Sequence, residues 1–187
     1  AEVVNRTAAR MAVLVDDLLV YAREGAPHRD VGPVDLGAIV EESVAEQEVT
    51  AAARSLELVP APPDAPVVVT GDRVALRQAV ANLLGNAVRL APSGTSVLVG
   101  AGVDGPWAWV AVDDAGPGIA PEDRERVFEW FWRGDERAAR TEGRSGMGLP
   151  IVEQIATAHR GEVRLAANDR GGSTFTLWLP AGGGAAP

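Results

Sequence analysis

Apolar residues near the start of the chain recur at alternating spacings of four and three, which is typical of a helix that packs against partner helices. They are Val4, Ala8, Met11, Val15, Leu18 and Ala22. Gly25 and Pro27 follow, and both residue types interrupt helices. The segment around this helix is too short to cover its apolar face. We therefore expect the helix to pack on the body of the protein or on another chain.

Beyond residue 33, segments with helical periodicity alternate with short strand-like segments. Longer helices are predicted over residues 35–54, with Asp35 as N-cap, 72–90 and 148–158, and a short helix begins at Pro121. Strands are predicted over residues 56–59, 67–70, 96–103, 107–113, 162–166 and 174–179, with a proline-rich turn over residues 60–66. This order predicts an α/β two-layer sandwich, in which one mixed sheet carries helices on one face.

These patterns divide the chain into four parts. We assign residues 1–25 to a bundle helix, 26–33 to a linker, 34–180 to the α/β body and 181–187 to a flexible tail. Hydrophobic residues make up 47% of the chain and charged residues 23%, which is typical of folded proteins, so the body can bury a core.

The charge balance and the missing cysteines narrow the chemistry. With 17 basic and 26 acidic side chains the net charge is −9, and the basic residues do not cluster, so nucleic acid is not expected as a partner. The count of zero cysteines excludes disulfides, thiolate metal sites and cysteine nucleophiles. No uninterrupted apolar stretch approaches the roughly 18 to 20 residues of a membrane span.

The helix predicted over residues 72–90 carries a polar stripe. Gln78, Asn82, Asn86 and Arg89 share one narrow sector of this helix, opposite an apolar face. Asparagine is a poor helix former, and Glu, Lys or Arg would serve a merely solvated face better. The stripe is either an ordinary polar surface or a set of amides that can hold Mg²⁺ already coordinated by phosphates.

Two glycine-rich loops are further candidates. The loop over residues 114–119 follows a predicted strand, and Asp114 could accept hydrogen bonds from an exocyclic amine; an ordinary turn has the same pattern. The loop over residues 143–150 runs directly into a helix, whose free N–H groups and dipole favour an anion such as phosphate. The alternative for this second loop is a simple linker.

An aromatic cluster lies between these loops, over residues 128–133. Such clusters usually belong to the core. This one could also anchor a lid whose arginines lie near phosphates, although interspersed acidic residues favour a solvated loop. The arginines are Arg133, Arg137, Arg140 and Arg144.

In order and spacing, the motifs together resemble the catalytic and ATP-binding domain of bacterial sensor histidine kinases. Residues 78–89, 114–119, 128–133, 146–149 and 172–175 resemble, in turn, its asparagine box, first glycine box, phenylalanine box, second glycine box and last glycine-containing box. The resemblance covers residues 34–180. Upstream, residues 10–19 are similar to the second helix of the dimerisation and phosphotransfer domain.

The resemblance implies a Bergerat-type fold that binds ATP and Mg²⁺. It implies that Asp114 binds the adenine amine, that Asn86 holds Mg²⁺, and that Asn82 and Arg89 lie near the phosphates. The implied catalytic residues are Asn82, Asn86 and Arg89. The glycines of the second glycine box would cap the triphosphate beneath a lid. The remaining implied nucleotide-binding residues are Gly116, Gly118, Ile119, Phe128, Phe131, Arg133, Ser145, Gly146, Met147, Gly148, Leu149, Ser173 and Thr174.

The family's phosphoacceptor histidine lies on the first bundle helix, and neither histidine of this sequence fits that place. His28 lies in the predicted linker, and His159 ends a helix, where a structural role is favoured. We therefore expect a fragment that binds ATP and phosphorylates a histidine outside this chain. The resemblance further implies a response regulator as partner, homodimerisation through the N-terminal helix, and a cytoplasmic position below a membrane-anchored sensor.

The sequence departs from the family pattern at three places, and three alternatives remain. Arg144 stands where a glycine is usual, Pro150 replaces a small residue, and Leu90 and Ala91 replace an aromatic residue or histidine and a threonine. Clamp-type ATPases of the same superfamily need a glutamate base, and no acidic residue lies between Arg73 and Arg89. A serine kinase of the superfamily and a non-catalytic nucleotide-sensing or dimerisation module remain as alternatives.

Overall fold

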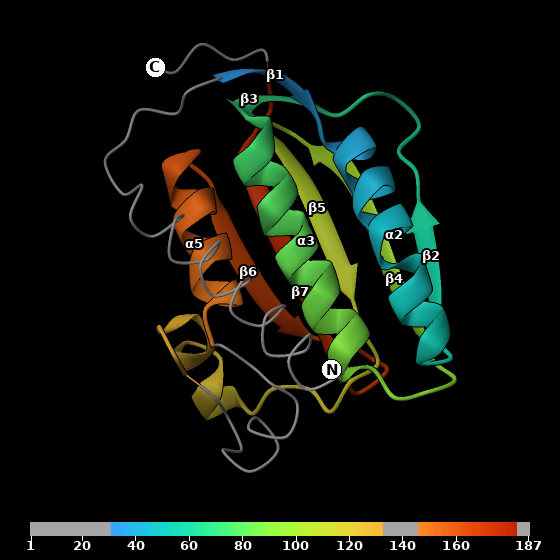
Figure 1. Cartoon of the computed structure of the whole chain (residues 1–187). Helices are drawn as coiled ribbons and strands as arrows, with labels where there is room; N and C mark the ends of the chain where they lie inside the picture. Colours follow the sequence, from blue (N-terminus) through green and yellow to red (C-terminus); the bar gives the residue numbers. More distant parts are fainter. Residues whose placement is uncertain (1–30, 133–145, 183–187) are drawn as a thin grey trace, which may run out of the picture.

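The structure is a computed structural model that describes residues 31–132 and 146–182. It has two layers, a five-stranded sheet and the helices α2, α3 and α5 over one face of it (Figure 1). The helices are α2 (Leu36–Ala53), α3 (Arg73–Leu90) and α5 (Gly148–Ala158). The sheet contains β2 (Glu57–Ala61), β4 (Ser96–Asp104), β5 (Trp107–Asp113), β7 (Ser173–Pro180) and β6 (Glu162–Ala167), in that order. The fold class predicted from the sequence is therefore confirmed.

The large sheet is mixed. Strand β2 pairs with β4 in parallel, and the other neighbours pair antiparallel. Alternate residues of β4, β5 and β7 are buried under the helices, among them Val97, Val110 and Leu177. The residues between them point to the other face of the sheet, because side chains alternate along a strand.

A separate two-stranded sheet lies at one end of the molecule, where β1 (Val31–Asp35) pairs antiparallel with β3 (Val68–Asp72) (Figure 1). Ala181 and Gly182 connect this small sheet to the large one. The N–H of Gly182 donates to Val68 O at 2.8 Å, and the N–H of Ala181 donates to Pro106 O at 2.9 Å.

Helix α3 lies between α2 and α5 and is capped by Asp72 (Figure 1). The Asp72 carboxylate accepts from the N–H groups of Val74 and Ala75, at 2.9 and 3.2 Å. Asp35 caps α2 in the same way, as predicted, by accepting from the N–H of Gly37. Such a cap is worth about 1 kcal/mol. It also orients the helix that carries the predicted asparagines.

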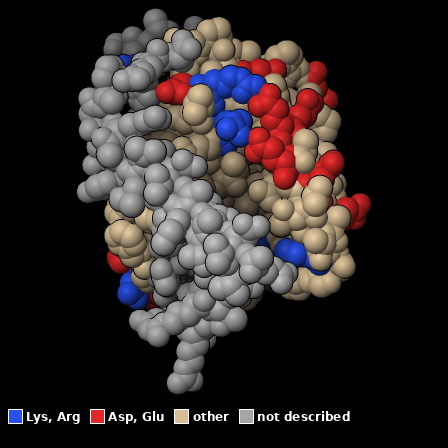
Figure 2. Space-filling view, viewed as in Figure 1, with Lys and Arg blue, Asp and Glu red and all other residues tan. Residues whose placement is uncertain are grey.

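Ion pairs join the exposed sides of α2 and α3. Arg73 pairs with Glu42 at 2.5 Å and Arg77 with Glu46 at 2.8 Å. Figure 2 shows these basic and acidic side chains side by side over the two helices. Because both pairs are exposed, each adds no more than about 1 kcal/mol, and the packed apolar faces hold the helices together.

The helices and strands predicted beyond residue 33 are observed, with differences at some ends, and the short helix predicted at Pro121 is a 3-10 helix, η1 (Pro121–Asp123). Strand β1 begins at Val31, within the segment assigned to a linker, because its backbone pairs with β3. Strand β2 continues through Pro60, which the sequence analysis placed in a turn; β2 is an edge strand, and an edge tolerates proline. Ala181 and Gly182, assigned to the flexible tail, are hydrogen-bonded to the body.

Other predictions fall on residues outside the described ones. These are the bundle helix over residues 4–22, the linker residues 26–30, the lid arginines 133–144, Ser145 and the tail residues 183–187. Within the described ranges, no helix combines the length and apolar character needed to cross a membrane.

Candidate functional site

Helix α3 and the first residue of α5 bring two of the predicted motifs together. Gly148 begins α5 directly beside the α3 asparagines. A Cβ built on Gly148 would lie 3.7 Å from Asn82 Oδ1 and 3.8 Å from Asn86 Nδ2. The Asn82 Nδ2 atom is buried and has no hydrogen-bond partner among residues 31–132 and 146–182. The two amides and the N-terminus of α5 therefore share one polar surface.

The C-terminal end of α3 carries Arg89, whose guanidinium donates a hydrogen bond to Asn86 Oδ1. The Arg89 carbonyl in turn accepts from the guanidinium of Arg54, the residue that follows α2, at 2.7 Å. Asn86 and Arg89 thus lie together, as their spacing of three on the helix predicts.

Gly146 and Phe131 connect the aromatic segment to the start of α5. Gly146 has φ +71°, and a Cβ on it would lie 2.8 Å from Phe131 Cα, so only glycine fits this conformation and contact. The N–H of Phe131 donates to Gly146 O at 2.9 Å. The Phe131 side chain is 64% exposed, whereas Phe128 packs edge-on against Phe175 of β7 with ring centroids 6.4 Å apart. The two predicted phenylalanines therefore have different surroundings.

Asp114 follows β5 and is 5% exposed. Its Oδ1 accepts from the N–H of Gly116 at 2.7 Å, and its own N–H donates to Ser173 O at 3.0 Å. Burial raises the pKa of this carboxyl above its usual range, although the N–H groups of Gly116 and Ser173 oppose the shift. A buried acceptor with a raised pKa is a frequent feature of binding sites.

The loop after Asp114 packs against the turn between β6 and β7. Gly118 has φ +70°, and a Cβ on it would lie 2.8 Å from Gly171 O. A Cβ on Gly172 would collide with Asp114 O, so the two segments touch through their backbones. Close backbone packing of this kind fixes the position of Asp114.

The other predicted residues are divided between the core and the far side of the sheet. Met147 is buried, and Ile119 and Leu149 pack partly buried against the core. Ser173 is buried beside Asp114, but the Thr174 hydroxyl donates to Asp113 Oδ2 at 2.5 Å, on the opposite face of the sheet. The structure thus does not bring Thr174 to Asp114, because neighbouring residues of a strand point to opposite faces.

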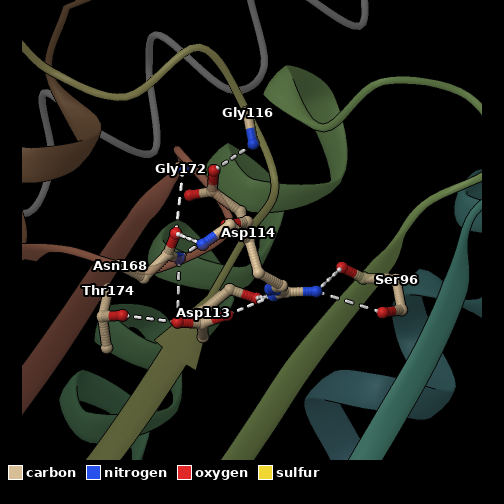
Figure 3. Close-up of polar contacts among 8 residues, drawn as sticks. Ser96, Asp113, Asp114, Gly116, Asn168, Gly172 and Thr174 are labelled. Atoms are coloured by element: carbon tan, nitrogen blue, oxygen red, sulfur yellow. Dashed lines mark hydrogen bonds and ion pairs between the residues drawn. The ribbon is translucent and has the colours of Figure 1, made fainter.

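The sequence analysis missed a polar network on that opposite face (Figure 3). Its centre is Asp113, which accepts from Asn168, Arg170 and Thr174. Arg170 also reaches Ser96 at the start of β4. Desolvation alone would raise the pKa of Asp113, but the hydrogen bonds from Thr174, Arg170 and Asn168 outweigh it and lower the pKa. In the sequence, only the two adjacent acidic residues at the end of the predicted strand 107–113 could have indicated this network.

A cavity of about 490 Å³ lies beside this network. It is lined by Ser55, Leu56, Glu57, Gly94, Thr95, Ser96, Ala115 and Arg170. It borders the Asp114 loop at Ala115, but it includes neither the α3 asparagines nor the start of α5. The cavity is therefore separate from the polar surface of Asn82, Asn86 and Gly148. We place the candidate site at that surface because it combines two side-chain amides with the N-terminus of a helix.

The mixed sheet with helices on one face, the asparagine-bearing helix and the glycine at the start of the last helix together define the Bergerat-type ATP-binding fold. The chain belongs to the family of histidine kinase-, DNA gyrase B- and HSP90-like ATPases, whose profile matches residues 71–183. Within that family it is similar to sensor histidine kinases, which confirms the resemblance found in the sequence.

Three relatives support this membership. The sensor-like histidine kinase SenX3 of Mycobacterium tuberculosis is 40% identical over 185 residues, which are 97% of this chain and 44% of the relative. The structure of the mycobacterial sensor histidine kinase MprB is 30% identical, with a TM-score of 0.68, over 81% of this chain and 98% of that one. Full-length ShkA in complex with AMPPNP is 32% identical, with a TM-score of 0.78, over 97% of this chain and 38% of that one.

The chain spans less than half the length of SenX3.

Proposed function

We propose that this chain binds Mg-ATP and donates the γ-phosphate to a histidine outside the chain, as the ATP-binding domain of a two-component sensor histidine kinase. The observation that carries this proposal is the meeting of Gly148 with Asn82 and Asn86. It places a helix N-terminus, two amides and an arginine on one surface, and these groups suit a polyphosphate without requiring a basic protein.

Asp114 is proposed to bind the adenine. Its carboxylate is almost fully buried and is oriented by the N–H of Gly116. A carboxylate can accept a hydrogen bond from the 6-amino group of adenine, and guanine has a carbonyl in that position. Gly116, Gly118 and Ile119 would shape the same pocket, and buried Ser173 lies beside it.

The phosphate groups are proposed to lie between α3 and the start of α5. Gly146, Met147, Gly148 and Leu149 lie at this N-terminus, where the helix dipole favours an anion. The orphaned, buried Asn82 Nδ2 is a donor that a phosphate oxygen would satisfy. Arg133 and Ser145 remain predicted contacts outside the described residues.

Mg²⁺ is proposed to bind through Asn86. A neutral amide oxygen suits Mg²⁺, which takes oxygen ligands and would draw most of them from phosphates and water. Asn86 Oδ1 now accepts a hydrogen bond from Arg89, so Mg²⁺ would take that place and leave the guanidinium to pair with phosphate. When bound, the ion neutralises phosphate charge.

Calorimetric titration of the chain with ATP, with and without Mg²⁺, tests the binding proposal. We expect binding by the wild-type chain, a loss of affinity of at least ten-fold in Asp114→Asn, and a smaller Mg²⁺ dependence in Asn86→Ala. Glu46→Gln is the matched control, since Glu46 pairs with Arg77 on the exposed side of α3. Failure of the wild-type chain to bind ATP would overturn the proposal.

The transfer step, the partners and the location are proposed from the relatives. The phosphohistidine would pass its phosphate to an aspartate of a response regulator, the N-terminal helix would dimerise, and the parent protein would be anchored in a membrane. Mixing the chain with a helical domain that carries the acceptor histidine tests the transfer. Acid-labile phosphate on that histidine is expected. Binding without transfer would indicate a nucleotide-sensing module, and acid-stable phosphoserine would indicate a serine kinase.

A further inference from the structure

Asn168, in the turn between β6 and β7, uses the whole hydrogen-bonding capacity of its side chain. Its Nδ2 donates to Asp113 Oδ2 at 2.9 Å and to Asp114 O at 2.8 Å. Its Oδ1 accepts from the N–H groups of Gly172 and Arg170, at 2.9 and 3.1 Å. The amide therefore joins its own turn to the end of the neighbouring strand β5 (Figure 3).

Arg170, two residues further on, makes a second link. One of its guanidinium nitrogens donates to Ser96 O and Ser96 Oγ, at 3.0 and 3.2 Å. The other donates to Asp113 O at 3.1 Å and to the Asp113 carboxylate. The Arg170 side chain is 32% exposed and that of Asp113 20% exposed, so this ion pair is better shielded than those on α2 and α3. Arg170 thus joins the start of β4 to the end of β5.

Both links act on the residue that is proposed to bind adenine. The Asp114 backbone is held on one side by Ser173 O and on the other by the Asn168 amide. The Asp113 charge raises the pKa of Asp114, although less than burial does, and Arg170 opposes it. The position and the charge of Asp114 therefore depend on the turn between β6 and β7, at the end of the sheet.

Closing the turn does not require these links. The backbone already closes it through the N–H of Asn168 to Gly172 O, at 3.3 Å, and the N–H of Gly171 to Asn168 O, at 3.2 Å. The bonds from Asn168 Nδ2 and from the Arg170 guanidinium leave the turn and end on β4, β5 and the Asp114 backbone. They would be superfluous in a hairpin that only reversed the chain.

We propose that Asn168 and Arg170 are positioning residues for Asp114, and that they set how strongly the domain prefers nucleotides whose purine carries a 6-amino group. The proposal rests on the proposed binding of ATP. Neither side chain touches the nucleotide in this scheme. They act by holding the Asp114 backbone, so that the carboxylate meets the amine in one fixed direction.

The test compares ATP with purine riboside triphosphate, which lacks the 6-amino group, by calorimetry on the 187-residue chain in Mg²⁺. Asn168→Asp keeps the size of the side chain but replaces the donor nitrogen with an oxygen, and the negative charge that it adds beside Asp113 is present for both nucleotides alike. We expect this variant to bind ATP about ten-fold more weakly, the factor that corresponds to losing one net hydrogen bond. Its affinity for purine riboside triphosphate should change less than two-fold. Arg164→Gln, on the same hairpin, should leave both affinities unchanged, because the described contacts of Arg164 are with exposed Glu162 and the Trp178 ring.

Several outcomes would overturn the inference. An equal loss of both affinities in Asn168→Asp would mean that the turn is merely structural, and an unchanged preference for ATP in a folded variant would mean that Asn168 does not act through Asp114. If Asn168→Asp does not fold, Arg170→Lys replaces it, since it keeps the charge and loses the forked hydrogen bonds. A wild-type chain that binds both nucleotides equally would overturn the role of Asp114 itself and the inference with it.

Discussion

Asp113 and Asp114 are neighbours in the chain with opposite electrostatic surroundings. Asp113 ends β5 with its side chain on the face of the sheet opposite to that of Asp114. There, hydrogen bonds from Thr174, Arg170 and Asn168 lower its pKa. Asp114 is buried on the other side, where desolvation raises its pKa. One step along the backbone therefore separates a carboxylate that stabilises the fold from one that is costly to ionise and that we propose as a ligand-binding group.

At this scale, Asp113→Asn should lower the free energy of unfolding by about 2 kcal/mol at pH 7, because a hydrogen-bonded, partly buried charge is lost. A lowered folded-state pKa gives stability that is present above the unfolded pKa, about 3.9, and is lost as the pH falls through the folded one. The difference between wild type and variant should therefore shrink below about pH 4. Urea unfolding from pH 3 to pH 8 measures it, and a constant difference would contradict the assignment.

Asp114→Asn should behave differently. The raised folded-state pKa means that ionisation of Asp114 costs stability, so the wild-type contribution of this group falls as the pH rises through that pKa. Asparagine removes the charge and keeps an oxygen for the N–H of Gly116. At pH 7 we expect Asp114→Asn to cost less stability than Asp113→Asn, while it loses nucleotide binding. A larger stability loss in Asp114→Asn would count against this account.

At the scale of elements, His159 connects three of them. It ends α5, its Nδ1 lies 2.8 Å from Ile155 O, and its Nε2 accepts from the N–H of Asp72 at 3.0 Å. Asp72 both ends β3 and caps α3. An Nε2 that accepts must carry no proton, so the neutral ring has its proton on Nδ1. This gives His159 the structural role expected from its position.

We predict that the ¹⁵N NMR spectrum of the His159 ring at pH 7 shows a protonated Nδ1 and a bare Nε2. His159→Leu should lower the free energy of unfolding by about 1 to 3 kcal/mol, because the N–H of Asp72 loses its acceptor. Nucleotide affinity of the folded variant should stay unchanged, since His159 contacts neither Asp114 nor the α3 asparagines. The opposite tautomer would refute the bond to Asp72.

Gly148 and Gly172 should separate binding from folding. A Cβ on Gly148 meets only ordinary van der Waals contacts, so Gly148→Ala should fold with stability within about 0.5 kcal/mol of wild type. It should bind ATP several-fold more weakly, because the methyl group lies between the asparagines and the phosphate position. Gly172→Ala has no such room against Asp114 O and should lose at least about 2 kcal/mol. Thermal unfolding with and without Mg-ATP distinguishes the two variants.

At the scale of the whole molecule, the sequence predicted the layers and most of the element boundaries. Helical periodicity from Asp72 and the loop-to-helix junction at Gly148 located α3 and α5, and strand-like segments located β4, β5 and β7. It did not predict β1, whose pairing with β3 is a contact between distant segments. The links from Asn168 and Arg170 to β5 were missed for the same reason, because they join segments that are far apart in the sequence. The residues of a turn do not indicate which strand end will lie beside it.

Ligand binding should stabilise the domain as one unit. At a free Mg-ATP concentration of 100 times its Kd, the folded state gains about 2.7 kcal/mol, which raises the Tm by roughly 5 to 11 °C for a domain of this size. Scanning calorimetry of the wild-type chain should show this shift, and Asp114→Asn should show at most about half of it at the same Mg-ATP concentration. An equal shift in both would remove Asp114 from the binding site.

The small sheet determines where residues 1–30 are tethered to the domain. Val31 pairs with Asp72, so the preceding segment joins the body at the N-terminal end of α3. Helix α3 has 18 residues, which at 1.5 Å each make a rod about 27 Å long. Asn86 and Arg89 lie near the other end of that rod. Val31 and the proposed Mg²⁺ ligand Asn86 therefore lie toward opposite ends of a single rigid strut.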